Sequence, residues 1–278
     1  MAGELYVVAT PIGNLGDMVP RAVDVLHAVD VVAAEDTRHS GRLLSHLAIK
    51  TPLISYHDHS DDRQITKIIE LLEQGKSVAL ISDAGTPLIS DPGYKLVRAV
   101  RQQGFRVVPI PGPCALIAAI SASGLPSDRF TFEGFPPAKT SARIKKFQSL
   151  VDESRTLVFY ESPHRIVDTL ADMSKVFGEA RDVVMARELT KTYETFLFGT
   201  LAEVQRQVES DLNQQKGEIV LIVKGVDIAT KESDTVEQQR VLSLLLDELP
   251  LKQAASLAAK ITGGQKNALY QLALSLKK

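Results

Sequence analysis

The chain has 278 residues, of which 44% are hydrophobic and 24% charged, as in a soluble globular protein with room for two domains. Its net charge of −2 excludes a uniformly basic nucleic-acid binder, so any nucleic-acid contact must be local. The single cysteine, Cys114, excludes an intrachain disulfide framework and favours a cytoplasmic location. An uncharged stretch at 107–127 has the length of a membrane span, but four prolines and two glycines within it argue against one, and we expect no membrane association.

The first part of the chain alternates apolar strand patterns with amphipathic helix patterns. This alternation predicts a parallel βαβ sheet that helices cover on both faces. The predicted strands are 5–9, 31–34, 52–56, 77–82 and 106–110, and the predicted helices are 21–28, 40–47, 61–74 and 94–103. We therefore expect an N-terminal α/β domain over residues 1–123.

The pattern changes near Gly124, where a second α/β domain is expected over residues 124–226. Its sheet is expected to be more mixed in strand direction. The predicted strands are 130–133, 156–161, 182–187, 194–198 and 218–224, and the predicted helices are 141–151, 163–177 and 201–211.

A polar break at 227–235 precedes three apolar-striped helices predicted at 236–249, 251–261 and 265–276. The glycines of Thr262-Gly-Gly264 form a tight turn, so residues 234–278 resemble a helix-turn-helix. Their net charge of only +2 is a weak nucleic-acid signal. A helical cap on the second domain is an equally good interpretation of this tail.

Three strands run into loops rich in glycine and proline. The apolar run Val78–Ile81 leads into Ser82–Gly93, and similar breaks follow the strands before Thr10 and Pro111. In open α/β sheets, ligands bind at the carboxyl ends of the strands, and glycine allows a close approach of the backbone. We expect a composite pocket, although each loop alone would read as an ordinary βα turn. Neither G-x-G-x-x-G nor a P-loop is present, which disfavours a conventional dinucleotide or nucleoside-triphosphate site.

Charged side chains gather at three other predicted strand ends. Ala34–Arg38 contains two acids and Arg38, although Asp36 or Thr37 could simply cap the next helix. Tyr160–Arg165 contains Glu161, His164 and Arg165, with Ser162 and Pro163 suited to a helix start. Arg187–Glu194 contains a further candidate, Lys191.

Two other tracts are candidate binding sites. Lys139–Lys146 holds four basic residues and no acid, and a helix would place Lys139, Arg143 and Lys146 roughly on one side. An ordinary solvated helix face explains this tract equally well. His57–Asp62 has two histidines at metal-ligand spacing, but its acids are better explained as helix caps, and no metal is expected.

Taken together, these motifs resemble the ribosomal small-subunit RNA 2′-O-ribose methyltransferase I family, within the tetrapyrrole methylase class. The resemblance covers about the whole chain, including the tail, and includes a closing strand at 217–225. Ser82-Asp-Ala84 stands where many tetrapyrrole enzymes carry Gly-Asp-Pro, and this difference favours the RNA subgroup. Five motifs carry the resemblance: Thr10–Asp17, Ala34–Arg38, Ser82–Pro87 with Asp91–Gly93, Pro111–Pro113 and Phe159–Arg165.

The resemblance implies a homodimeric, S-adenosylmethionine-dependent enzyme with a two-domain tetrapyrrole-methylase-like fold. Its substrate would be the ribose of a decoding-centre cytidine, cytidine 1402, in the 16S rRNA of the small ribosomal subunit. By position, the cofactor would lie against Pro11, Gly13, Asp83, Ala84, Leu88, Pro111, Gly112, Cys114, Ala115, Tyr160, Ala186 and Arg187.

A ribose hydroxyl is a poor nucleophile, so its methylation benefits from a nearby base. The unranked candidates for catalysis are Glu35, Asp36, Glu161, His164 and Lys191, and a lysine would serve only if desolvation lowered its pKa. The candidates for RNA binding are Arg38, Lys139, Arg143, Lys145, Lys146 and Arg165. Two alternatives stay open: a tetrapyrrole or other small-molecule methyltransferase with the same cleft, and a non-catalytic RNA- or ribosome-binding protein.

Overall fold

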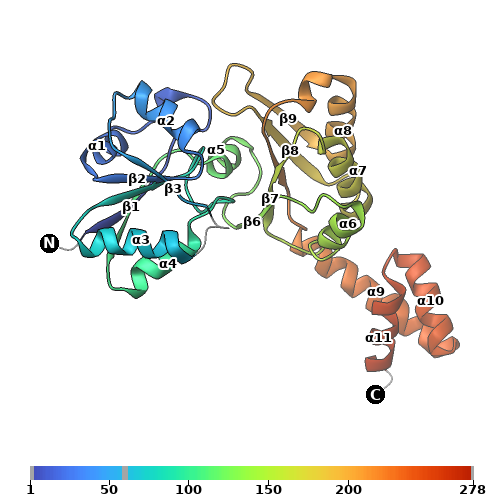
Figure 1. Ribbon diagram of the computed structural model, residues 1–278. Coiled ribbons are helices and arrows are strands. Elements are labelled where there is room, and N and C mark those ends of the chain that lie inside the picture. Colours follow the sequence, from blue (N-terminus) through green and yellow to red (C-terminus); the bar gives the residue numbers. More distant parts are fainter. Residues whose placement is uncertain (1–2, 58–61, 277–278) are drawn as a thin grey trace. The chain divides into compact units, whose positions relative to one another are not determined.

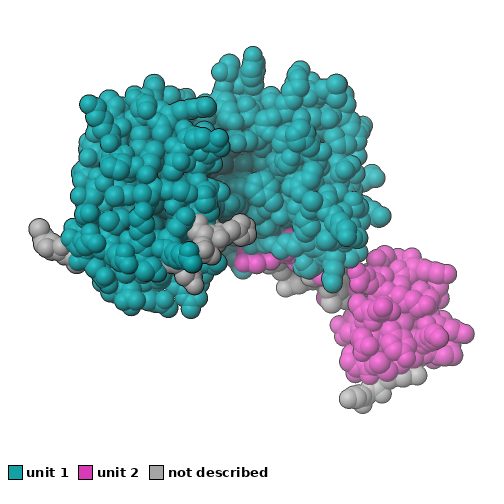
Figure 2. Space-filling view, in the orientation of Figure 1, with its two compact units in different colours: residues 1–149, 156–224 teal, residues 150–155, 225–278 magenta. Residues whose placement is uncertain are grey.

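The computed structural model describes residues 3–57 and 62–276, which form two compact units (Figure 2). Unit 1 comprises residues 1–149 and 156–224, and unit 2 comprises residues 150–155 and 225–278. In the described part of the chain, no helix is long and apolar enough to cross a membrane.

The first sheet of unit 1 is wholly parallel, as the alternating pattern predicts (Figure 1). Its strand order is β3-β2-β4-β1-β5. The four residues of β4 are all buried because helices cover both faces of the sheet. The strands are β1 (Glu4–Val8), β2 (Val31–Ala34), β3 (Leu53–Ser55), β4 (Val78–Ile81) and β5 (Arg106–Ile110).

Each face of this sheet has its own apolar core. Leu26 and Leu44 pack against one face, and Ile68 and Leu96 pack against the other. The hydrophobic period of the helices produces this division, because side chains three and four residues apart share one side of a helix. The helices on the two faces are α1 (Pro20–Ala28) with α2 (Thr37–His46), and α3 (Asp62–Glu73) with α4 (Tyr94–Gln102) (Figure 1).

The second sheet has the order β6-β7-β10-β8-β9 and mixes strand directions, as expected. Only the β6–β7 pair is parallel among its neighbouring pairs, and the other three pairs are antiparallel. Its central strand β10 is buried at every position. The strands are β6 (Phe130–Gly134), β7 (Thr156–Glu161), β8 (Asp182–Arg187), β9 (Thr195–Thr200) and β10 (Ile219–Val223).

Helix α5 (Ala115–Ala122) follows the last strand of the first sheet but packs on the second sheet. Its buried residues Leu116 and Ile120 belong to one core with Val158 and Val220. This packing joins the two sheets within unit 1. The boundary expected after residue 123 therefore falls between two elements that share a core, and it remains a prediction.

The other elements of the second half of unit 1 include a helical layer with a buried ion pair. Phe147 of α6 packs edge-on against Phe159 of β7, with 5.8 Å between ring centroids. The guanidinium of Arg143, also on α6, is 2.6 Å from the carboxylate of Asp172 on α7. The helices are α6 (Thr140–Gln148), α7 (Ile166–Phe177) and α8 (Leu201–Ser210).

Helix α7 begins three residues later than the sequence suggests. Ser162 and Pro163 lie in a turn in which the backbone N–H of Arg165 donates to the carbonyl of Ser162 over 3.0 Å. Arg165, rather than Ser162, is the residue that precedes the helix. The prediction that Ser162 and Pro163 begin this helix is therefore wrong.

Unit 2 contains three helices with an apolar core of their own. Leu242, Ala255 and Leu269 are buried in this core, one from each helix. Gly263 has a φ of 72° and ends the second of them in the left-handed conformation, which glycine adopts without strain. The helices are α9 (Ile228–Glu248), α10 (Leu251–Thr262) and α11 (Lys266–Leu276). The polar break expected at 227–235 is thus largely helical, since α9 already begins at Ile228.

Candidate active site

The three glycine- and proline-bearing loops lie side by side because β4, β1 and β5 are neighbours in the first sheet. Thr10 and Gly85 exchange backbone hydrogen bonds of 2.9 and 3.0 Å, which join the first two loops. The hydroxyl of Thr86 donates to the carbonyl of Pro113 over 2.9 Å, which joins the second loop to the third. The sheet order and these three bonds create the composite pocket that the sequence predicts.

The loop after β4 is conformationally strained. Leu88 has a φ of 73° and Ser90 a φ of 64°, in a left-handed region that costs a residue with a side chain on the order of 1–2 kcal/mol. Strain of this kind persists where the surrounding structure holds the backbone in place. Here the strained residues flank Ile89 and precede Asp91, which line the cavity described next.

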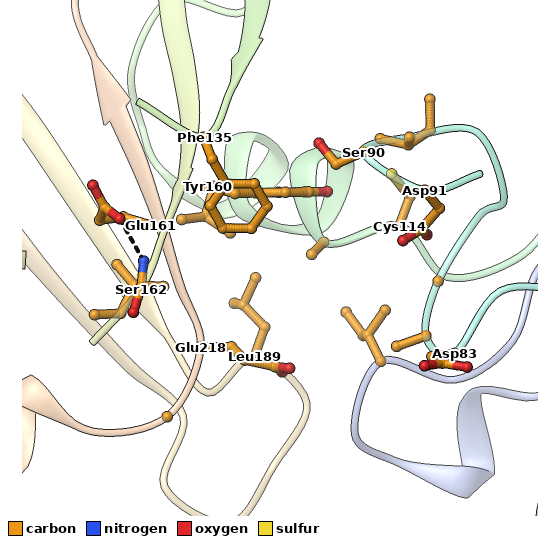
Figure 3. Close-up of a pocket in the computed structure, with 18 of the residues that line it drawn as sticks. Asp83, Ser90, Asp91, Cys114, Phe135, Tyr160, Glu161, Ser162, Leu189 and Glu218 are labelled. Carbon is orange, nitrogen blue, oxygen red and sulfur yellow. Dashed lines mark hydrogen bonds between the residues drawn. The ribbon is translucent and has the colours of Figure 1, made fainter. Parts of the chain in front are cut away.

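A cavity of about 360 Å³ opens between these loops and the second sheet (Figure 2). One side is formed by the loops that follow β1, β4 and β5, and the other by the ends of β7 and β10 with the loop after β8. Figure 3 shows Asp83, Ser90, Asp91 and Cys114 on the first side and Tyr160, Leu189 and Glu218 on the second. The remaining lining residues include Ile12, Ala84, Gly85, Thr86, Ile89, Ala115, Phe135, Glu161, Ser162, Gly217 and Val220.

Five of the twelve residues predicted to bind a cofactor line this cavity: Asp83, Ala84, Cys114, Ala115 and Tyr160. Pro11 and Gly13 line an adjoining groove that shares Ile12 and Asp83 with the cavity. The other five lie outside both linings: Leu88, Pro111, Gly112, Ala186 and Arg187.

The structure gives these other residues supporting positions. A Cβ atom at Gly112 would lie 2.9 Å from the Cβ of Ala9, so glycine permits this close packing of β1 against the third loop. Ala186 is fully buried in the core beneath the cavity. Arg187 is 7% exposed, and its guanidinium donates to the carbonyl of Tyr193 over 3.0 Å.

Aromatic rings form one wall of the cavity. The ring centroid of Tyr160 lies 4.8 Å from that of Phe132 and 5.7 Å from that of Phe135, both in edge-on arrangements. The Tyr160 hydroxyl accepts a hydrogen bond of 3.1 Å from the backbone N–H of Leu116. Burial and the neighbouring Cys114 raise the pKa of Tyr160, so the phenol stays protonated at neutral pH. An apolar wall with one polar edge suits a heteroaromatic ring.

Acidic groups occupy the opposite side. The carboxylate of Asp83 accepts a hydrogen bond of 3.1 Å from the backbone N–H of Asp36. Burial, together with the negative charges of Glu35 and Asp83, raises the pKa of Asp91 to about 6, although a hydrogen bond from Ser82 acts in the opposite direction. A half-buried carboxyl with a pKa near neutrality is a candidate proton acceptor. Asp91 is absent from the catalytic candidates drawn from the sequence, because no motif rule marks an aspartate at the far end of a loop.

The carboxylates of two predicted catalytic candidates are engaged elsewhere. Asp36 caps α2, where its carboxylate accepts hydrogen bonds from the backbone N–H groups of Arg38 and His39 at 2.8 and 3.3 Å. These bonds lower the pKa of Asp36. Glu161 is buried and accepts from the Thr169 hydroxyl and pairs with Arg165, both at 2.6 Å. Glu161 lines the cavity but its oxygens serve the local structure.

The other candidates also differ in position. His164 is exposed in the turn before α7 and lines neither the cavity nor the groove. Lys191 lines the groove, where its ammonium contacts Glu188 and Glu218 at 2.8 and 2.7 Å. Burial lowers the pKa of Lys191, but these two hydrogen bonds outweigh it, so the net pKa is raised and the lysine stays charged. Glu35 lies outside the cavity lining but close enough to influence Asp91.

The predicted one-sided basic patch on α6 does not form. Arg143 is 2% exposed and pairs with Asp172, because this side of α6 packs against α7. Lys139 and Lys145 are exposed, whereas Lys146 pairs with Glu133 at 2.6 Å. The side chain of Arg38 is 90% exposed, more than those of Arg143, Lys146 and Arg165. Arg165 is held by Glu161.

The histidine-rich tract falls mostly outside the described residues, including His59. His57 is described, and its Nε2 lies 2.7 Å from the Ser55 hydroxyl. Within residues 3–57 and 62–276, no group of three histidine, cysteine or acidic side chains is arranged to hold a metal ion.

The chain, with its two sheets and the cavity between them, belongs to the tetrapyrrole methylase class. The family described as Tetrapyrrole (Corrin/Porphyrin) Methylases matches residues 4–205, and the family described as the RsmI C-terminal HTH domain matches residues 232–277. A uroporphyrin-III C-methyltransferase from Thermus thermophilus shares the fold, with a TM-score of 0.55 and 20% identity over 80% of this chain and 94% of that one.

Two curated relatives named ribosomal RNA small subunit methyltransferase I match almost the whole chain. The protein from Pseudomonas aeruginosa is 58% identical over 98% of this chain and 97% of its own length. The protein from Pasteurella multocida is 54% identical over 99% of this chain and 98% of its own length. The chain belongs to the ribosomal RNA small subunit methyltransferase I family and is a methyltransferase.

Proposed function

We propose that this enzyme transfers a methyl group from S-adenosylmethionine to the ribose 2′-hydroxyl of a decoding-centre cytidine in 16S rRNA. The observation that carries the proposal is the cavity, which combines an aromatic and apolar wall with facing carboxylates. Membership of a family named for ribosomal RNA supports the choice of substrate.

The residues of the cavity fit S-adenosylmethionine chemically. The cofactor carries an adenine ring and two cationic groups, a sulfonium and an amine. The wall of Tyr160, Phe135 and Leu189 suits the ring, and the carboxylate of Asp83 suits a cation. The cavity volume, about 360 Å³, falls in the range of small-molecule sites. Gly85 and Gly217 in the lining lack side chains that would reduce this space.

When bound, S-adenosylmethionine supplies an electrophilic methyl group. Asp91 lines the same cavity and would accept the proton that the ribose hydroxyl loses as its oxygen gains the methyl group. Its pKa near 6 places it closer to neutrality than an ordinary aspartate, and most of it is ionised at pH 7. Lys191 is a poor alternative base because it stays protonated.

Several features favour a large RNA substrate. Lys139, which precedes α6, and Lys145 within it carry exposed positive charge, and residues 232–277 match a family described as a helix-turn-helix domain. We assign unit 2 to substrate docking because its three helices have an apolar core of their own. A homodimeric, cytoplasmic enzyme belongs to the same proposal.

A tetrapyrrole substrate is the second candidate, because the family description and the Thermus neighbour both concern tetrapyrroles. The two candidates share the cofactor but differ in acceptor. Calorimetry with S-adenosylmethionine tests the cofactor, and methyl transfer to small ribosomal subunits compared with porphyrinoids tests the acceptor. Transfer to the porphyrinoid alone would overturn the RNA proposal, and absence of cofactor binding would leave a non-catalytic RNA-binding protein.

A further inference from the structure

A second depression, of about 490 Å³, adjoins the cavity, and the residues that α2 contributes to it lie outside the motifs that carry the family resemblance. One side is the exposed face of α2, and the other includes Lys191 and Glu218. We call this depression the α2 groove. It shares four lining residues with the cavity: Ile12, Asp83, Ala84 and Glu218. A molecule whose reacting part enters the cavity can therefore extend along the groove.

The α2 side of the groove presents a row of hydrogen-bond donors. His39, Arg42 and His46 are spaced by three and four residues, so they lie along one side of the helix. All three are exposed and line the groove. Within the described ranges, none of these side chains has a hydrogen bond or ion pair to another residue. The guanidinium of Arg42 is thus available to an external anion.

The other charged groups in the groove give the side opposite α2 no net positive charge. The ammonium of Lys191 contacts the carboxylates of Glu188 and Glu218, and the carboxylate of Asp83 accepts the backbone N–H of Asp36. Glu218, 75% exposed, remains a negative charge on the side opposite α2. An anion in the groove is therefore attracted to the α2 side and repelled from the other.

A polynucleotide substrate has the shape that this arrangement requires. A ribose in the cavity is joined to a phosphate on each side. The RNA backbone on both sides of that ribose must therefore pass over the rim of the cavity. Arginine binds phosphate through paired N–H groups, and histidine N–H groups also donate to phosphate oxygens. An ordinary solvated helix face would carry the same residues, but it would not open into the reaction cavity.

We propose that His39, Arg42 and His46 bind the phosphates of the RNA strand next to the methylated ribose. This inference rests on the proposed rRNA methylation and adds the path by which the strand reaches the cavity. It assigns the three residues to substrate positioning, with no part in holding the cofactor, since none of them lines the cavity.

The test uses the full-length enzyme with small ribosomal subunits from cells that lack it. The variants are Arg42→Glu, Arg42→Lys and the triple His39→Ala/Arg42→Ala/His46→Ala. Arg101→Glu on α4, another exposed arginine, is the matched control for charge. Binding is measured against salt concentration, methyl transfer gives KM and kcat, and calorimetry gives affinity for S-adenosylmethionine.

We expect the triple variant and Arg42→Glu to raise KM about tenfold and to reduce the slope of log affinity against log salt by roughly 0.7 per lost phosphate contact. Arg42→Lys should recover most of the affinity, and Arg101→Glu should behave as wild type. Cofactor affinity should not change in any of them. If the wild-type enzyme methylates the subunit and the triple variant has the same KM and salt slope, the inference is wrong and the proposed function still stands.

Two further results would also overturn it. If sedimentation shows that the triple variant has lost self-association along with subunit binding, the groove is an interface between copies of this chain. If the wild-type enzyme binds S-adenosylmethionine but transfers no methyl group to the subunit, the proposed function and this inference fail together.

Discussion

The backbone N–H of Asp36 donates a 3.1 Å hydrogen bond to the carboxylate of Asp83, which joins the loop after β2 to the loop after β4. This bond leaves Asp83 free to face the cavity with its second oxygen. Asp36, which caps α2, is thus hydrogen-bonded to Asp83, which lines the proposed cofactor site. Changes at either residue should therefore affect both the loop and the ligand.

We predict that Asp83→Ala weakens S-adenosylmethionine binding without unfolding the protein, because the variant removes a carboxylate that faces the cavity. The lost hydrogen bond should lower the free energy of unfolding by only about 1 kcal/mol. Asp83→Asn is the matched control, since its amide oxygen can still accept from Asp36 while the charge is gone. Unchanged calorimetric affinity in a folded Asp83→Ala protein would remove this loop from the site.

We predict that Asp91→Asn lowers kcat by about 10²-fold or more, because general-base assistance is lost. Cofactor affinity should change much less than kcat. In the wild-type enzyme, activity should fall on the acid side near pH 6, as the raised pKa of Asp91 implies that the carboxylate takes up its proton there. The pH profile of kcat/KM checks this, and a variant that keeps both kcat and the acid limb would show that another group is the base.

The same raised pKa predicts that Asp91→Asn, which lowers activity, increases the stability of the fold. A carboxyl whose pKa is about 6 in the folded state and 3.8 in the unfolded state stabilises the fold below pH 4, and this contribution is lost as the pH rises to 6. Asp91→Asn should therefore raise the unfolding free energy at pH 7, by about 1 kcal/mol once solvent screening is allowed for. The difference in Tm from wild type should shrink at pH 4. A Tm at pH 7 equal to or below that of wild type would argue against a destabilising charge at this position.

We predict that replacing Arg143 lowers the stability of the fold, whereas replacing Lys139 and Lys145 weakens RNA binding. Arg143→Ala leaves Asp172 buried without its partner and should cost about 3–5 kcal/mol of unfolding free energy. Lys139→Ala with Lys145→Ala should leave Tm nearly unchanged and reduce the salt dependence of subunit binding, as each lost phosphate contact lowers the slope. Thermal unfolding and salt titrations of both proteins check the two halves. A salt slope that matches wild type would return the two lysines to the role of a solvated helix face.

The parallel sheet and its loops were predictable because their signals are local. The ranges of β2 and β5 agree with the sequence prediction, and Asp36 caps α2, which was one of the two interpretations open for it. The burial of Arg143 was not predictable, since helical spacing places it beside Lys139 and says nothing of the helix packed against that side. Phe135 and Glu218 line the cavity because the second sheet lies beside the loops of the first. The residues next to Phe135 and Glu218 in the sequence do not indicate this arrangement.

We predict that deletion of residues 227–278 leaves cofactor binding nearly intact and reduces methylation of the ribosomal subunit. The apolar core of the tail is formed by residues of its own three helices, so the truncation removes a unit with a core of its own. Circular dichroism and cofactor titration on the truncated protein come first, because newly exposed apolar surface could cause aggregation. A folded truncation that methylates the subunit at the full rate would show that the tail does not dock the substrate.

The central claim is the transfer of a methyl group to a ribose in 16S rRNA, and mass spectrometry of that rRNA from cells with and without the enzyme tests it most directly. We predict that the rRNA from cells without the enzyme lacks one 2′-O-methyl group on a decoding-centre cytidine, and that the purified enzyme with S-adenosylmethionine restores it. Identical modification patterns in the two rRNAs would contradict the proposed function.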